Sequence, residues 1–137
     1  MSYILYADGG SRGNPGPSGA GAVIYRDEVA VAEISLALGT TTNNVAEYTA
    51  LLEGLKKLQE VNTDSTPVEV RMDSELVIKQ MRGEYKVKHP NLKHLHLEAQ
   101  NLAGNFAHIT YTHIPREKNG EADALANAAM DTASSAR

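Results

Sequence analysis

The segment YILYADGGSRGNPG, residues 3–16, carries the strongest indication of the fold. The continuous apolar run Tyr3–Ala7 is typical of a β-strand covered on both faces, and it ends at an acidic residue, Asp8. The segment that follows, Gly9–Gly21, is rich in glycine and proline and predicts a loop or turn. It is not a Walker loop, because no Gly-Lys-Ser/Thr follows it. Its glycines would let the backbone approach a ligand closely.

The rest of the chain alternates between strand and helix patterns. Two strands, Ala22–Tyr25 and Val29–Leu38, are joined by a short polar connection and are expected to form a hairpin. Apolar residues then recur at helical spacing from Val45 to Gln59. Further on we expect strands at Val68–Met72 and His108–Ile114, and helices that start at Ser74, span Leu92–Leu102, and run from Asn119 to about Met130.

An antiparallel meander followed by strand–helix units predicts the α/β class, with a single mixed five-stranded sheet of antiparallel and parallel strands flanked by helices. No repeat or linker divides the chain, so residues 1–137 are expected to form a single domain, with about 131–137 as a frayed tail. Crossovers of this kind place loops at the carboxyl ends of the parallel strands, where α/β proteins carry their functional sites.

Composition restricts the possible functions. A chain of 137 residues with 42% hydrophobic residues is expected to fold as one soluble domain. The absence of cysteine excludes disulfides, zinc–thiolate sites and thiol nucleophiles. No apolar run approaches the roughly 20 residues that span a bilayer, and no secretory signal is recognised, so we expect a cytoplasmic protein without a membrane partner. The formal net charge of −4 argues against nucleic acid as a partner, unless several acids are reserved for metal ions.

Four carboxylates are candidates for a common site. Asp8 and Asp73 each end a predicted strand, and if these strands are parallel neighbours, both side chains emerge at the same edge of the sheet. Glu47 borders the apolar stripe of its helix, where a carboxylate is costly unless it is paired or bound to a metal ion. Asp123 lies one turn into the last helix. Two strand-end acids and two helical acids could therefore meet around one point.

Each acid also has a purely structural interpretation. Asp73 could cap the helix that follows it, and Asn44 with Glu47 could form a variant capping box. Asp123 could complement the dipole of its helix. None of these interpretations explains why an acid ends the first strand, or why all four acids map to one edge.

Four blocks of sequence resemble ribonuclease HI. They are Asp8-Gly-Gly-Ser-x-Gly-Asn-Pro-Gly16, Thr41-Thr-Asn-Asn-x-Ala-Glu47, Asp73-Ser and Arg116-Glu-Lys-Asn-x-x-Ala-Asp123. They follow one another in the order of the family, and the resemblance runs from Tyr3 to about Met130. It implies a ribonuclease H-like fold for essentially the whole chain.

In that family the four acids hold two Mg²⁺ or Mn²⁺ ions per active site beside the scissile phosphate. Hard cations prefer oxygen ligands, and a pair of ions can activate water and stabilise the leaving oxygen. Matched to this chain, Asp8 would bridge both ions, Glu47 and Asp73 would complete one ion site, and Asp123 would complete the other. The resemblance thus implies an endoribonuclease that hydrolyses the RNA strand of RNA–DNA hybrids and leaves 5′-phosphate and 3′-hydroxyl ends.

The resemblance also implies a set of residues that bind the hybrid. Asn14, Asn43 and Asn44 match family positions that touch the minor groove, and Thr42 matches a residue that grips a phosphate of the DNA strand. Amides both donate and accept hydrogen bonds, so they can recognise the 2′-hydroxyls that distinguish RNA from DNA. Helix capping is the alternative role for this cluster. The expected substrate-binding residues are Asn14, Thr42, Asn43, Asn44, Arg116 and Asn119.

The chain departs from many relatives between its second and third predicted helices. Some relatives carry a basic helical protrusion there, but Arg82–Pro90 is too short for one. Few basic residues then remain in this region to attract a nucleic acid, namely Lys86, Lys88 and Lys93. Glu75 stands where several relatives have Gln, which weakens any amide contact to a base at that position.

A second departure concerns histidine. The loop Pro115–Lys118 is short and lacks the mobile histidine of many relatives. His113 precedes the loop, but strand alternation indicates an anchored residue, so we expect Glu117 or water to take the place of the missing side chain. The pair His94 and His96 would face apart on a helix, and we interpret it as surface.

Two other functions remain compatible with the pattern. One is a non-catalytic hybrid-binding module, which would not need four acids beside a phosphate. The other is a resolvase-like nuclease of the same fold, which would not need the asparagines. We expect a monomer, and the Ala/Ser-rich end of the chain is compatible with fusion to another domain at the C-terminus.

Overall fold

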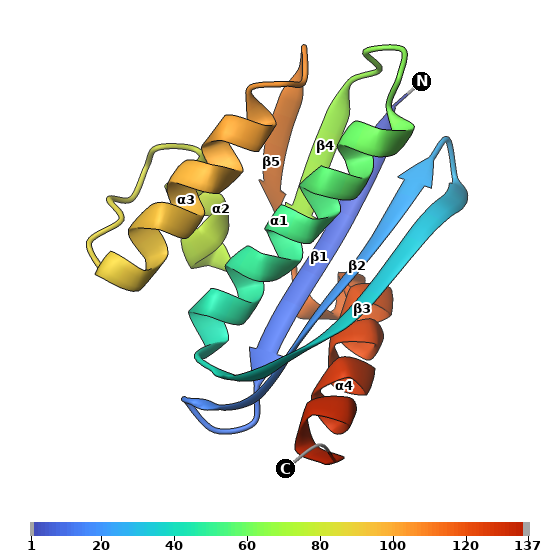
Figure 1. Cartoon of the computed structure of the whole chain (residues 1–137). Helices are drawn as coiled ribbons and strands as arrows, with labels where there is room; N and C mark the ends of the chain where they lie inside the picture. The colour runs from blue at the N-terminus through green and yellow to red at the C-terminus, as the bar shows by residue number, and fades with distance from the viewer. Residues whose placement is uncertain (1, 136–137) are drawn as a thin grey trace.

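The computed structural model describes residues 2–135 and arranges them as five strands, four α-helices and one 3-10 helix (Figure 1). The strands are β1 (Tyr3–Ser11), β2 (Gly16–Arg26), β3 (Val29–Thr41), β4 (Val68–Met72) and β5 (Ile109–His113). The helices are α1 (Asn43–Val61), α2 (Glu75–Met81), α3 (Pro90–Ala103) and α4 (Gly120–Ser135), with the 3-10 helix η1 (Arg116–Lys118) before α4.

The strands form one mixed sheet in the order β3-β2-β1-β4-β5. The pairs β1–β2 and β2–β3 are antiparallel, whereas β1–β4 and β4–β5 are parallel. This confirms the predicted α/β class and the five-stranded mixed sheet. The register pairs Tyr6 with Arg71, so Asp8 and Asp73, two residues further along each strand, leave the sheet at the same edge.

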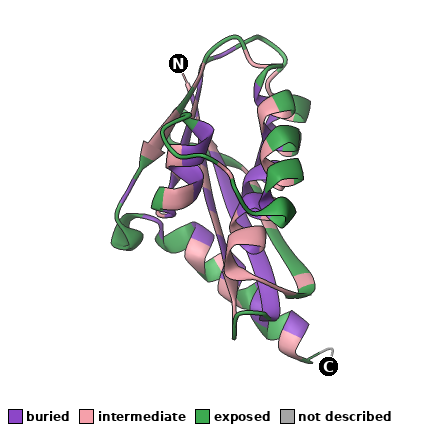
Figure 2. Ribbon diagram, turned by 90° about the vertical axis from the view of Figure 1, so that its left-hand side faces the viewer, coloured by how far each residue is buried: buried purple, intermediate pink, exposed green. Residues whose placement is uncertain are grey.

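Helices cover the two faces of the sheet separately. Helix α1 packs on β1 and β2 with α3 beside it, whereas α4 packs against β1, β2 and β3 from the opposite face (Figure 1). The core between α1 and the sheet contains Leu5, Leu51, Leu55, Val70 and Ile78, all fully buried. Burying each such side chain contributes about 1.5–3 kcal/mol. Figure 2 shows the buried residues along the strands and on the helix faces turned toward them.

The segment Gly9–Gly21, predicted to be a loop, is mostly strand. β1 continues to Ser11 and β2 starts at Gly16, so the turn between them is only four residues long, residues 12–15. The prediction was wrong because clustered glycines were interpreted as turn formers. These glycines are needed because two helices approach the sheet closely. The order of residues along the chain does not reveal that approach.

Glycines in these strands make room for the backbones of α1 and α4. A Cβ atom added to Gly9 would lie 2.2 Å from the carbonyl carbon of Ala46 in α1. A Cβ atom added to Gly21 would lie 2.3 Å from the carbonyl oxygen of Ala122 in α4. Glycine inside a strand is typical of such a close backbone approach. The two helices therefore rest directly on the sheet.

Burial along β1 alternates, which corrects the expectation of a strand covered on both faces. Tyr3, Leu5 and Ala7 are buried under α1, whereas Ile4 and Tyr6 are only half-buried. The reason is that α4 covers just part of the second face, over β1, β2 and β3.

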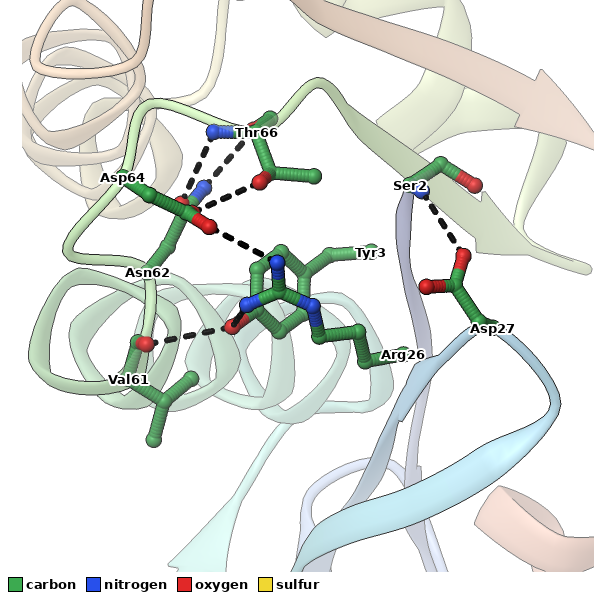
Figure 3. A network of polar contacts seen from close by, with 8 residues as sticks. All are labelled: Ser2, Tyr3, Arg26, Asp27, Val61, Asn62, Asp64 and Thr66. Atoms are coloured by element: carbon green, nitrogen blue, oxygen red, sulfur yellow. Dashed lines mark hydrogen bonds and ion pairs between the residues drawn. The ribbon is translucent and has the colours of Figure 1, made fainter.

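A polar network fixes the end of the sheet where β1 begins (Figure 3). Arg26 donates to the Tyr3 hydroxyl at 2.8 Å and forms an ion pair with Asp64 at 2.7 Å. The Tyr3 hydroxyl donates in turn to the carbonyl of Val61, the last residue of α1. Hydrogen bonds from Thr66 and Arg26 lower the pKa of Asp64 to about 2. This network joins β1, the β2–β3 hairpin and the α1–β4 connection at the end opposite Asp8.

The last helix is longer than predicted. Helix α4 continues past Met130 to Ser135, so residues 131–135 are not a frayed tail; Arg137 and its neighbour lie outside the described residues. Met130 and Ala133 are both buried, which favours the continued helix. Within residues 2–135, no helix has both the length and the hydropathy that crossing a membrane requires.

Candidate active site

The four predicted acids line one cleft at the carboxyl ends of β1 and β4. The cleft has a volume of about 350 Å³. Asp8 lies on β1 and Asp73 directly after β4, while α1 supplies Glu47 and α4 supplies Asp123. Two parallel strands and two helices on opposite faces of the sheet thus converge at one edge. The residues that line the cleft are Asp8, Gly9, Gly10, Ser11, Arg12, Asn43, Glu47, Asp73, Arg116, Asp123, Asn127 and Met130.

Local structure leaves these acids without capping roles. Helix α2 is capped by Ser74, whose hydroxyl accepts from the amide of Val77, so Asp73 is not its cap. Helix α1 is capped by Thr42, which removes the need for a capping box built on Glu47. The purely structural interpretations of Asp73 and Glu47 therefore do not apply.

Burial and mutual repulsion raise the pKa values of two acids in the cleft. The pKa of Asp8 rises to about 8, mainly because of burial, and also through repulsion by Asp73 and a hydrogen bond with Asp123. The pKa of Glu47 rises to about 7, again mainly by burial, although a hydrogen bond from Ser74 opposes the shift. Clustered carboxylates of this kind resist ionisation unless a cation neutralises them.

The donor set fits hard divalent cations. Within residues 2–135, no three His, Asp or Glu side chains converge closely enough to enclose a single ion. Mg²⁺ does not require such a cage, because proteins usually bind it through one or two carboxylates together with water and substrate phosphates. An open cleft lined by four carboxylates is compatible with this mode of binding.

Asn119 has a different position from the one expected. Its side chain is 1% exposed, so it does not contact a bound hybrid as predicted. Its amide nitrogen donates to Asp73 Oδ1 at 2.8 Å and to the carbonyl oxygen of Ala7 at 3.0 Å. Asn119 therefore holds the carboxylate of Asp73 in place and ties the start of α4 to β1.

The other expected substrate-binding residues divide between two hollows. Asn43 and Arg116 line the cleft with the acids. The Nη2 atom of Arg116 lies 3.8 Å from Oδ1 of Asp123. Asn14, Thr42 and Asn44 line a second hollow of about 260 Å³ at the start of α1. Asn14 accepts a hydrogen bond from the backbone amide of Asn43 at 3.1 Å, which holds the β1–β2 turn against α1.

Two residues of this second hollow were missed by the sequence interpretation. His89 and Asn91, at the start of α3, lie beside Asn14 and Thr42. His89 Nδ1 accepts from the backbone amide of Asn91 at 3.1 Å and so caps the helix. The only local signal was the helix start at Pro90, and it does not reveal that α3 begins next to α1.

The histidine and loop predictions need correction. His113 is exposed at the end of β5, so it is not the anchored residue that was expected. His96 is half-buried and contacts the carbonyl of Gln80 at 3.2 Å, so the surface interpretation is wrong for His96, whereas His94 is exposed. Glu117 is exposed on η1 and is not among the residues that line the cleft.

Sequence comparison decides the family. A family model described as "Reverse transcriptase-like" matches residues 6–129. Ribonuclease HI of Halobacterium salinarum is 43% identical over 129 residues, which are 93% of this chain and 64% of the relative. The chain belongs to the ribonuclease H family. The RNase H1 structure from the same archaeon superimposes with a TM-score of 0.90 at 40% identity, covering 96% of this chain and 99% of that one.

Two other ribonuclease H structures are also similar to this chain. The N-terminal RNase H domain of Rv2228c from Mycobacterium tuberculosis gives a TM-score of 0.94 at 47% identity, over 99% of this chain and 98% of that one. The whole mycobacterial protein, described as bifunctional, is 50% identical over 135 residues, but the matched part is only 36% of its length. LC11-RNase H1, solved in complex with an RNA/DNA hybrid, gives a TM-score of 0.89 at 47% identity, over 96% and 98% of the two chains.

Proposed function

We propose that this chain is an endoribonuclease that hydrolyses the RNA strand of RNA–DNA hybrids. The observation that carries the proposal is the convergence of Asp8, Glu47, Asp73 and Asp123 on one open cleft next to a row of asparagines. The similarity to LC11-RNase H1, which was solved with an RNA/DNA hybrid, supports the choice of substrate.

The proposed chemistry is a displacement at phosphorus with two divalent ions, Mg²⁺ or Mn²⁺. Such ions activate water and stabilise the leaving oxygen of an in-line attack, which here would leave 5′-phosphate and 3′-hydroxyl ends. Asp8, Glu47, Asp73 and Asp123 would hold the ions. The raised pKa values of Asp8 and Glu47 support this role, because a bound cation would remove the repulsion. Asn119 keeps Asp73 turned toward the cleft.

Recognition of the hybrid is assigned to the two hollows. Asn14, Asn43 and Asn44 would read 2′-hydroxyls of the RNA strand across the minor groove, since amides can donate and accept at the same site. Thr42 would hold a phosphate of the DNA strand, with His89 and Asn91 beside it at the start of α3. The exposed Lys86, Lys88 and Lys93 would add general attraction for the backbone.

The experiment that tests this function presents one labelled sequence as an RNA–DNA hybrid, an RNA duplex, a DNA duplex and single strands. We expect Mg²⁺-dependent cleavage of the RNA strand of the hybrid alone. Cleavage of the DNA duplex would favour a resolvase-like nuclease, and tight hybrid binding without cleavage would favour a binding module. The variant Asp8→Asn is the matched control, because it changes one atom of the cleft and should bind without cutting.

We further propose that residues 1–137 act as a single monomeric domain. The mycobacterial relative carries a matching domain within a longer, bifunctional protein, so fusion to another domain is compatible with the proposed activity. Sedimentation of the purified chain with and without hybrid would test the monomer.

A further inference from the structure

Arg12 is a cation at the rim of the acidic cleft. It is the first residue of the turn between β1 and β2, and it lines the cleft together with the four acids. Among the described residues that line this cleft, Arg12 and Arg116 are the basic ones. An arginine at the edge of a phosphate-binding cleft is suited to grip a phosphate, because its planar guanidinium binds oxyanions in a bidentate manner.

The backbone that carries Arg12 is firmly fixed. Its amide donates to the carbonyl of Pro17 at 2.8 Å. The hydroxyl of the preceding Ser11 donates to the carbonyl of Thr41 at 2.9 Å, and Asn14 binds the amide of Asn43 on the other side of the turn. The backbone of Arg12 is therefore held in place, and the position of its guanidinium depends on the groups that the side chain contacts.

Those partners lie on α4. Arg12 forms an ion pair with Asp131 at 2.5 Å and donates to the carbonyl of Asn127 at 3.4 Å. The side chain of Asn127 binds the carbonyl of Asp123 at 2.9 Å. Asp123, Asn127 and Asp131 are spaced four residues apart, so they follow one face of the helix at intervals of about 6 Å. Arg12 thus lies one to two helical turns from a catalytic acid, a distance that spans one or two nucleotides.

We propose that Asp131 competes with substrate phosphate for Arg12. In the free protein the carboxylate of Asp131 occupies the guanidinium in place of a phosphate. When a hybrid enters, Arg12 exchanges this carboxylate for a phosphate of the strand in the cleft, one or two nucleotides from the cleaved bond. Asp131 therefore weakens substrate binding and sets the affinity of the cleft. This inference rests on the proposed function, because it assumes that the cleft receives a hybrid.

Exposure of the ion pair makes the exchange feasible. The side chains of Arg12 and Asp131 are 41% and 68% exposed. Exposed ion pairs are worth about 0.2–1 kcal/mol, which corresponds to no more than about a fivefold effect on binding. Because the exposed ion pair contributes so little, a substrate phosphate that the guanidinium binds in a bidentate manner can displace the carboxylate.

The test is a double-mutant cycle on binding. Arg12→Ala, Asp131→Ala and the double variant are placed in the Asp8→Asn background, and their affinity for a fluorescent hybrid is measured by anisotropy in Mg²⁺ at several salt concentrations. Asp131→Ala should tighten binding about two- to fivefold. Arg12→Ala should weaken it about tenfold and reduce the salt slope by about one. In the Arg12→Ala background, Asp131→Ala should have no further effect.

Matched controls separate competition from general repulsion. Glu60 is an equally exposed acid, 68%, paired with Lys57 on α1 and remote from the cleft. Glu60→Ala should leave the affinity within about twofold. Equal tightening by Asp131→Ala with and without Arg12, or weaker binding by Asp131→Ala, would overturn the proposal. If Arg12→Ala does not fold, Arg12→Lys replaces it and should weaken binding by a smaller factor.

Outcomes for this inference and for the proposed function are distinct. With Asp8 intact, the Arg12 variant should raise KM while kcat stays within about twofold, because it acts on binding. Failure of the unsubstituted chain to cut a hybrid would refute the proposed function itself. Cleavage with normal KM in Arg12→Ala would refute only the role of Arg12.

Discussion

The side-chain amide of Asn119 donates to Oδ1 of Asp73 at 2.8 Å, which links the residue before α4 to the acid that follows β4. The same nitrogen donates to the carbonyl of Ala7, next to Asp8 on β1. One buried side chain thus sets the position of one acid and adjoins a second. Removing a residue that orients a metal ligand commonly lowers activity or metal affinity about 10- to 100-fold.

Asn119→Ala should therefore lower both stability and turnover. It removes one hydrogen bond from half-buried Asp73 and one from the buried Ala7 carbonyl, and a buried acceptor left unsatisfied costs about 1–3 kcal/mol. Turnover should fall about 10- to 100-fold, and the Mg²⁺ concentration for half-maximal activity should rise. Asn62→Ala is the control, because Asn62 also makes two hydrogen bonds but lies in the network at the opposite end of the sheet. If both variants lose stability alike and neither changes turnover, Asn119 has no role in positioning.

Asp8→Asn should abolish Mg²⁺-dependent cleavage and leave the fold intact or stabilised. The pKa of Asp8 is raised to about 8 by burial and by the neighbouring acids, so a neutral amide relieves repulsion in the metal-free protein. Thermal melting in a chelator should give a melting temperature equal to or above that of the unsubstituted chain. More than about a tenth of the original rate would contradict its proposed role as a metal ligand, since electrostatic groups of a site contribute about a hundredfold or more.

Asn43→Ala should raise KM more than it lowers kcat. Its side chain lines the cleft, so the change removes a contact made in both the bound and the transition state. Asn14→Ala should do the same, but it also removes the hydrogen bond to the amide of Asn43 and is expected to loosen the turn. Steady-state kinetics on hybrids with single 2′-deoxy substitutions would check the assignment. Loss of kcat at unchanged KM would argue for a catalytic role instead.

The short loop before α4 provides a test of product release. His113→Ala should leave turnover unchanged and stability nearly so, because the side chain is exposed at the end of β5. Glu117→Gln should slow turnover moderately, since Glu117 directly follows Arg116, which lines the cleft, and an acid there could draw a metal ion from the product. Rates should be measured across pH. A loss of about 10²-fold or more in His113→Ala, with folding unchanged, would identify the histidine as the proton carrier.

The network at the far end of the sheet should make stability depend on acid. Hydrogen bonds from Thr66 and Arg26 lower the pKa of Asp64 to about 2. Between that value and the ordinary pKa of 3.8, the folded chain binds fewer protons than the unfolded chain. The stabilisation is therefore complete above pH 4 and is lost as pH falls through about 2. The difference in melting temperature between the unsubstituted chain and Asp64→Asn should shrink over this range, and a constant difference would contradict the assignment.

Sequence patterns predicted most of the fold and the meeting place of the acids. The strand ends at Asp8 and Asp73 were visible because an acid directly after an apolar run is conspicuous. Burial was harder to predict. The sequence shows Asn119 only as a polar residue at the start of a helix, and the folded chain is needed to see that it lies buried beneath Asp73. His89 was missed for a related reason. Its neighbours in the second hollow, Asn14 and Thr42, are distant in sequence and come together only when α3 packs beside α1.

The glycines beneath α1 and α4 have a consequence for the geometry of the cleft. Glu47 follows Ala46, whose carbonyl carbon leaves no room for a Cβ atom on Gly9, and Asp123 follows Ala122, which stands in the same relation to Gly21. Each helix contacts the backbone of the sheet directly, with no side chain between them. This direct contact therefore determines the distance between the acids of the two helices. Rotamers can adjust a carboxylate, but the space available to the proposed metal ions depends on the absence of a methyl group at each of these two glycines.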